Sequence, residues 1–174
     1  MAAPSPTLLV AANQKVALVK ISGRASFNSS VEFKNLVYGL REQGRRRFVL
    51  DLTDCLILDS TFLGVLAGFA LKLTEPSERR ATITLLNPNA RILDLLENLG
   101  VAHLFQVIQG SDPLSQECKE VQTPGDGPDK LEASRTCLEA HETLMAINSA
   151  NIPKFKDVAR FMAEDLKKLE ARKQ

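Results

Sequence analysis

The sequence has few cysteines and no long apolar run. Its three cysteines, Cys55, Cys118 and Cys137, are odd in number and widely spaced, so we expect neither a disulfide framework nor a cysteine-ligated metal site. No hydrophobic leader follows Met1, and no apolar segment is long enough to cross a bilayer. These absences predict a protein of a reducing compartment, the cytoplasm.

A strong net charge and the common catalytic motifs are also missing. The 22 Lys and Arg residues nearly balance the 21 Asp and Glu residues, for a formal net charge of +1, which gives no electrostatic reason to expect nucleic acid or a membrane as partner. No glycine-rich phosphate loop is present. Cys55, expected in a turn, has neither His103 nor His141 near it in sequence. We assign His141 to a solvated helix face, and we expect no enzyme activity, no cofactor and no metal.

The apolar pattern predicts an α/β fold, and 44% hydrophobic residues suffice for a sizeable core. Two strand-like runs, 7–12 and 16–21, predict an antiparallel hairpin that ends at Gly23. Further strands are expected at 47–52, 81–86 and 104–109, and helices at about 29–44, 61–74 and 88–100. We expect a capping box from Ser29 to Glu32 and Pro88 in the first turn of the third helix. This order implies a mixed β-sheet packed against helices.

The last third of the chain has a different composition. Residues 110–130 are rich in proline, glycine and acids, and predict a linker that is at least partly disordered. Two helical patterns follow within 131–174, and each helix alone would be marginal in water. They must pair as a hairpin, dock on the first domain or dimerise. The predicted organisation is a domain at 1–109, a linker at 110–130 and a helical extension at 131–174.

The segment from Phe48 to Ala67 organises the rest of the chain. A buried strand is followed by a polar break, a second short apolar run and the cluster Asp59-Ser60-Thr61, after which apolar residues recur at helical spacing. The first N–H groups of a helix lack intrahelical acceptors and lie in a positive potential, so an anion is readily accommodated there. Ser60 is therefore either a helix cap or a site for a phosphoryl group, and geometry alone favours the cap.

The residues Asp59-Ser60-Thr61-Phe62-Leu63-Gly64, preceded by Val49-Leu50-Asp51-Leu52, resemble the core signature of the STAS family, and more narrowly of bacterial anti-sigma factor antagonists. The resemblance covers about 7–109 and implies the STAS fold. It places Asp59 at the family's aspartate, Ser60 at the phosphate acceptor and Thr61 at the second hydroxyl residue. Leu63 and Gly64 match the last two positions, whereas Phe62 replaces the usual glycine.

The resemblance implies a partner-switching mechanism. The unmodified antagonist binds an anti-sigma factor that is also a serine kinase, and a sigma factor is released. The kinase then phosphorylates the antagonist, which dissociates, and a serine phosphatase resets it. With this resemblance we favour Ser60 as a regulatory phosphate acceptor and Thr61 as a second candidate acceptor.

The other residues near Ser60 have two interpretations each. Asp59 orients the hydroxyl or recruits the kinase, or it only complements the helix dipole. Phe62 is an exposed anchor for a partner or it fills the core. Leu63 and Gly64 shape the start of the helix. Arg24, expected on a loop after the hairpin, pairs with a phosphate or an acidic partner, or is a solvated cation.

The rival hypothesis is a structural adaptor. In it the STAS domain is a scaffold, Ser60 is only a cap, and the C-terminal helices form a homodimer or larger oligomer. A lipid- or ligand-associated STAS protein is a third class, for which the sequence shows no pocket signature.

Overall fold

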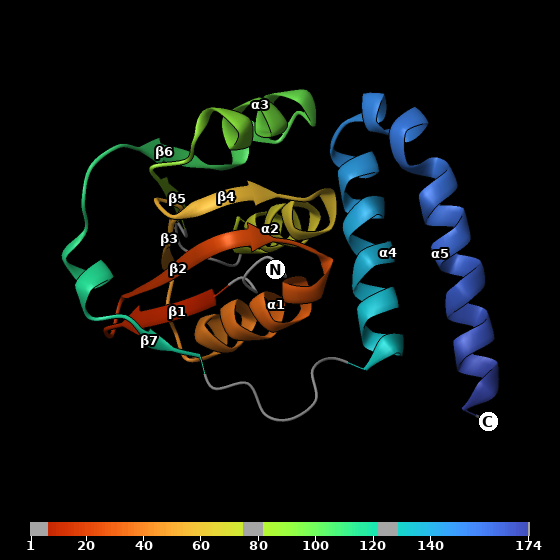
Figure 1. The fold of residues 1–174 in the computed structure, drawn as a ribbon, viewed down its shortest axis with the longest axis horizontal. Coiled ribbons are helices and arrows are strands. Elements are labelled where there is room, and N and C mark those ends of the chain that lie inside the picture. The colour runs from red at the N-terminus through yellow and green to blue at the C-terminus, as the bar shows by residue number, and fades with distance from the viewer. Residues whose placement is uncertain (1–6, 75–81, 122–128, 174) are drawn as a thin grey trace, which may run out of the picture.

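The protein, described here from a computed structural model, is a mixed β-sheet with helices stacked on it (Figure 1). The structure describes residues 7–74, 82–121 and 129–173. The strands are β1 (Thr7–Ala12), β2 (Val16–Ala25), β3 (Arg47–Asp51), β4 (Cys55–Leu58), β5 (Thr82–Leu86), β6 (Gln106–Ile108) and β7 (Lys119–Glu120). The helices are α1 (Phe27–Glu42), α2 (Ser60–Leu73), α3 (Ala90–Asn98), α4 (Lys130–Ile147) and α5 (Ile152–Arg172), with short 3-10 turns η1 (Ala102–Leu104), η2 (Pro113–Gln116) and η3 (Ser149–Asn151).

The sheet has the strand order β6-β5-β3-β2-β1-β7, with β4 paired to the far end of β2. The strands β2, β3, β5 and β6 are parallel, whereas β1 runs antiparallel to β2 and to β7. The prediction that Gly23 ends the second strand is wrong. Gly23 adopts a positive φ of 81° at a register shift, and β2 continues to Ala25 alongside β4. Arg24 therefore lies on a strand and not on a loop.

The hydrophobic core lies between the sheet and the helices α1 and α2. Four phenylalanine rings are almost wholly buried in it, and they pair across elements: Phe33 with Phe62 at 4.6 Å between centroids, and Phe48 with Phe69 at 4.8 Å. Helix α4 packs along α2 on the side away from the sheet, and α5 packs on α4 (Figure 1). The C-terminal helices thus form a hairpin that docks on the first domain, so two of the three alternatives hold together in this chain.

Several helices and strands begin a few residues away from their predicted first residues. Helix α1 begins at Phe27 and not after Ser29, because Ser26 has an extended backbone directly after β2 and its N–H donates to Ser29 Oγ at 3.1 Å. Pro88 lies outside α3, since Asn89 is the N-cap and accepts a hydrogen bond from Ile92 N at 3.0 Å. Cys55, predicted in a turn, is the first residue of β4.

Part of the predicted linker is folded onto the sheet. Residues 113–116 form η2, and β7 pairs with the open edge of β1 through Leu9–Glu120 and Val10–Lys119. The predicted linker thus has folded elements in this part, because β1 leaves a free row of backbone groups that a short strand can pair with. Residues 122–128 of the linker lie outside the described residues.

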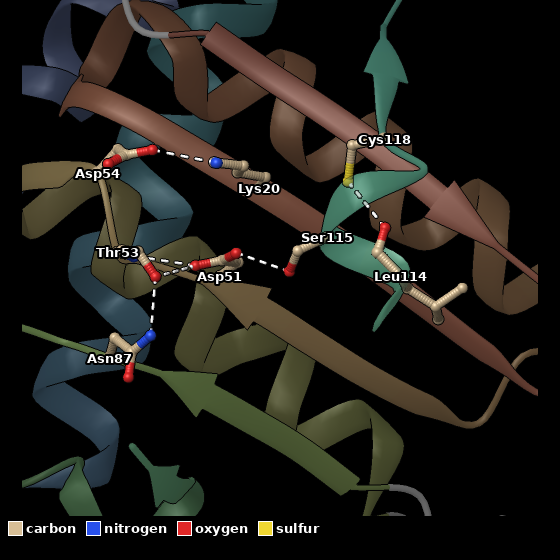
Figure 2. Close-up of polar contacts among 8 residues, drawn as sticks. All are labelled: Lys20, Asp51, Thr53, Asp54, Asn87, Leu114, Ser115 and Cys118. Carbon is tan, nitrogen blue, oxygen red and sulfur yellow. Dashed lines mark hydrogen bonds and ion pairs between the residues drawn. The ribbon is translucent and has the colours of Figure 1, made fainter. Parts of the chain in front are cut away.

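A buried carboxylate holds η2 against the sheet (Figure 2). Side chains alternate along a strand, so Leu50 faces the helices while Asp51 faces η2. Asp51 accepts hydrogen bonds from Thr53 N at 3.0 Å, Thr53 Oγ1 at 2.5 Å and Ser115 Oγ at 2.8 Å. Burial raises the pKa of the Asp51 carboxyl, but these hydrogen bonds and the nearby charge of Lys20 outweigh burial, so its pKa lies below the ordinary value of 3.8.

We expect the stability of the fold to depend on the charge of Asp51. Because its folded-state pKa is the lower one, the ionised form stabilises the fold above pH 3.8, and this contribution is lost as the pH falls through the folded-state value. Asp51→Asn should therefore lower the free energy of unfolding by about 1–3 kcal/mol near neutral pH. Urea unfolding from about pH 6 to about pH 3 should show this deficit shrinking. A deficit that stays constant across the range would contradict the assignment.

Candidate functional site

Ser60 is the first residue of α2, and a single residue, Asp59, separates it from the end of β4. The order of strand, turn and helix predicted around it is confirmed, with Asp59 as the N-cap in an extended backbone conformation. Ser60 is only half-buried, whereas the residues that follow it in the first turn of α2 are buried. The hydroxyl thus lies where the helix dipole is most positive.

Asp59 joins the starts of two helices. Its Oδ1 accepts a hydrogen bond from Phe62 N at 2.8 Å, within α2, and its Oδ2 accepts one from Phe27 N at 2.7 Å, at the start of α1. Its own N–H donates to Ala25 O at the end of β2, at 3.0 Å. Both carboxylate oxygens therefore accept hydrogen bonds from first-turn backbone N–H groups that have no acceptor within their own helix. This gives Asp59 a structural role at this position.

Ser60 contacts a histidine from the C-terminal extension. Its Oγ lies 3.1 Å from His141 Nε2, and His141 Nδ1 lies 2.7 Å from Cys137 O. A carbonyl only accepts, so Nδ1 carries a proton, and in the neutral ring Nε2 accepts the hydrogen bond from the Ser60 hydroxyl. The assignment of His141 to a solvated face is wrong, because its side chain is 4% exposed and packs on Phe155 at 5.0 Å between ring centroids. The helix face that looked solvated in sequence is the one that docks on α2.

Thr61 lies beside Ser60 under the same helix. Its side chain is buried, and Oγ1 lies 3.4 Å from Cys137 Sγ. Burial raises the pKa of the Cys137 thiol, with a smaller opposing effect from Thr61 and a further rise from the Asp59 charge. Burial also raises the pKa of Cys55 to about 11. Both thiols are thus protonated at neutral pH.

The residues of the signature that follow Thr61, which are Phe62, Leu63 and Gly64, are buried inside the protein. Phe62 is fully buried against Phe33, so of its two interpretations the structure shows core filling and not an exposed partner anchor. Leu63 is also fully buried. A Cβ on Gly64 would lie 2.4 Å from Ala140 O, so only glycine lets the α4 backbone come this close to α2. Leu63 and Gly64 therefore have no exposed surface for a partner while α4 is docked.

Arg24 does not join this cluster. It is exposed on β2, at the position that pairs with Ile57 of β4. Among the described residues, the structure gives no hydrogen bond or ion pair between Arg24 and Ser60 or Thr61. The same part of the chain contains no group of three His, Cys, Asp or Glu side chains placed to hold a metal ion.

Polar contacts fix α4 at its middle and at its C-terminal end. Lys34 of α1 forms an ion pair with Glu139 at 3.0 Å. At the C-terminal end, the buried Asn151 amide donates to Leu99 O at 2.9 Å and to Leu144 O at 2.8 Å. Between α1, α2 and α4 runs an open groove of about 630 Å³, and its lining includes Val65 as well as two lysines and two glutamates: Lys34, Lys72, Glu139 and Glu142. None of the helices in 7–74, 82–121 or 129–173 has the length and hydrophobicity of a membrane span.

Sequence reasoning did not find His141 or Cys137 as neighbours of the site. Ser60 and His141 are 81 positions apart, and Thr61 and Cys137 are 76 apart. One signal was available: Gly64 and Gly68 repeat at helical spacing on α2, and small residues at this spacing allow close helix packing.

Comparisons with known proteins agree on the fold. The family model described as "Mlab, STAS domain" matches residues 8–109. An anti-sigma factor antagonist from Mycobacterium paratuberculosis is similar in structure, with a TM-score of 0.54 and 19% identity over 67% of this chain and 97% of that one. The anti-sigma factor antagonist SpoIIAA in its unphosphorylated form is similar with a TM-score of 0.52 and 13% identity, over 63% of this chain and 91% of that one. The phosphorylated form of SpoIIAA from Bacillus is similar with a TM-score of 0.50 and 14% identity, over 63% of this chain and 95% of that one.

These relatives leave about a third of this chain unmatched. The matched 63–67% of this chain corresponds roughly to the domain that ends near β6, where the family model also ends. A comparison with curated protein sequences gives no match. At identities below 20%, the likeness is one of fold.

A pair of substitutions in α2 tests the close packing of α4. Gly64→Ala should lower the free energy of unfolding by about 1–3 kcal/mol, because the new methyl group meets backbone atoms of Ala140 that cannot move aside. Gly68→Ala is the matched control: its Cβ would lie 3.7 Å from Thr143 Cγ2, an ordinary contact, so the higher helix propensity of alanine should raise stability by about 0.5–1 kcal/mol. Equal effects of the two substitutions in denaturant unfolding would contradict this packing.

Proposed function

This chain belongs to the STAS domain family, and on that premise we propose that it is an anti-sigma factor antagonist that is regulated by phosphorylation of Ser60. It binds an anti-sigma factor with serine kinase activity, releases a sigma factor and so regulates transcription. A serine phosphatase restores the unmodified state. The protein has no catalytic activity of its own and acts in the cytoplasm.

The position of Ser60 carries this proposal. A serine at the first residue of α2, directly after the Asp59 cap, presents its hydroxyl at a helix N-terminus where a phosphate is electrostatically favoured. Phosphorylation adds about −1.5 to −2 charges and three acceptor oxygens. A partner that docks on this end of α2 would meet that charge, and a coupling free energy of about 1–3 kcal/mol is enough to switch its binding.

The other residues of the signature have supporting roles in this proposal. Asp59 fixes the starts of α1 and α2 and thereby the position of the Ser60 hydroxyl. Leu63 and Gly64 shape the first turn of α2. Thr61 is a second candidate acceptor that becomes available only when α4 no longer covers it. Arg24, exposed on β2, is a candidate contact for an acidic partner.

The docked C-terminal helices favour a second candidate, the structural adaptor. In this proposal Ser60 serves only to hold His141, and α4 is a permanent part of the domain. Helix α5 exposes 39% of Val158 and 55% of Phe161, an apolar surface through which such a scaffold would form a homodimer.

Phosphopeptide mapping of the protein isolated from its own cells separates the two candidates. We expect phosphate on the peptide that contains Ser60, and its loss in a Ser60→Ala strain, because the hydroxyl is the only group that the substitution removes. Thr61, next to it, is the internal control for site assignment. A peptide that stays unmodified in growth and under stress would favour the adaptor.

Charge at position 60 should weaken partner binding without unfolding the protein. With the co-purified anti-sigma factor kinase in a titration, Ser60→Asp should raise Kd by about 5- to 150-fold, the range of a typical coupling free energy. Ser60→Ala should leave Kd nearly unchanged, since it adds no charge. If Ser60→Asp binds as tightly as the wild type, the switch at this residue is ruled out.

A further inference from the structure

Helix α4 lies directly over the residue that the proposed switch has to modify. The Ser60 hydroxyl is hydrogen-bonded to His141, and the neighbouring Thr61 is buried under Cys137. A kinase active site has to surround the serine it phosphorylates, and a partner that senses the phosphate has to touch it. Neither can happen while α4 keeps this position.

The contact leaves no room for a phosphoryl group in the direction of α4. The distance of 3.1 Å between Ser60 Oγ and His141 Nε2 is that of a direct hydrogen bond, so no atom fits between them. One turn further along α2, Gly64 contacts the Ala140 backbone so closely that even a methyl group would clash. Helix α4 therefore cannot yield locally at Ser60 and has to lift from α2 to make space.

The charges around Ser60 also oppose a phosphate under α4. The Asp59 carboxylate is adjacent in sequence and lies at the same start of α2. A phosphate carries about −1.5 to −2 charges and would face this carboxylate in a half-buried site. Solvation of the phosphate is recovered when α4 moves away.

Helices α4 and α5 can move as one unit. Apolar residues of α5 at heptad spacing pack on α4: Phe155, Ala159, Met162, Leu166 and Leu169. Ion pairs between Arg135 and Glu170 and between Lys173 and Asp129 add to this seam. Both helices follow the last strand in the chain, so their displacement breaks no strand pairing of the sheet.

We propose that α4 is an intramolecular competitor for the face of α2 that carries Ser60, Thr61, Gly64 and Gly68. This inference takes Ser60 as the phosphate acceptor proposed above. The partner docks on the same face after displacing α4, so the free protein is autoinhibited. Phosphate on Ser60 excludes both occupants from this face. By linkage, α4 docking disfavours the phosphorylated state at equilibrium by the same factor by which phosphate weakens α4 docking.

The test uses the full chain with phosphoserine installed at position 60 during synthesis, and hydrogen–deuterium exchange read out by mass spectrometry. Exchange of peptides from α4 and α5 should speed up at least tenfold (on the order of 1.4 kcal/mol of lost docking). Peptides from β3 and β5 should keep their protection. Alkaline phosphatase should restore the original exchange pattern.

The matched control places phosphoserine in place of Ala90. Ala90 is the first residue of α3, as Ser60 is of α2, but it is exposed and not covered by α4. Its phosphate should leave α4 exchange unchanged. A second variant, Ser60→Asp, brings a smaller charge and should raise exchange in the same peptides by a smaller factor.

Three outcomes would overturn the inference: α4 exchange that stays at the unmodified level, greater protection of α4 through pairing of the phosphate with His141, or an equal effect of the control at position 90. The result is independent of the proposed function, because neither kinase nor partner is used. Release of α4 together with an unmodified Ser60 in cells would refute only the proposed function. Phosphate on Ser60 in cells together with a firmly docked α4 would refute only the competitor.

Discussion

The double cap made by Asp59 is the interaction on which the rest of the structure depends. One carboxylate satisfies backbone donors of both α1 and α2, and the Asp59 backbone is tied to the end of β2. The starts of two helices and the end of a strand are thereby fixed at one point. A charged hydrogen bond of this kind is stronger than a neutral one, so α2 is held rigidly, and Ser60 takes its place as a direct consequence.

The position of α2 then determines how the C-terminal helices dock. With α2 fixed, its outer side presents Gly64 and Gly68, and a second helix can approach there to within backbone contact. Helix α4 uses this surface and brings His141 to Ser60 and Cys137 to Thr61. The same small residues that allow the intramolecular contact would allow a partner helix to take its place. The surface next to Ser60 is thus covered by a helix of the same chain.

The elements that neighbouring residues specify are the ones that the sequence predicts correctly. The strand and the helix after it follow from neighbouring residues and were predicted correctly, as were both C-terminal helices. The cap itself is Asp59, whereas the sequence pattern pointed to Ser60 as the cap. The errors concern residues whose surroundings are set by distant parts of the chain. His141 looked solvated because its neighbours in sequence are polar, Phe62 left two interpretations open, and 113–120 looked like linker because a two-residue strand has no pattern of its own.

The sequence by itself determined the class of fold, the order of the elements and the place of Ser60 at the start of a helix. These depend on hydrophobic periodicity and on capping, which act over a few residues. Only the tertiary structure decided that α4 covers Ser60, that His141 is the acceptor for its hydroxyl and that Asp51 holds η2. Such contacts depend on how rigid elements cross and how closely their backbones approach, and no local stretch of sequence encodes a distance between residues 81 positions apart.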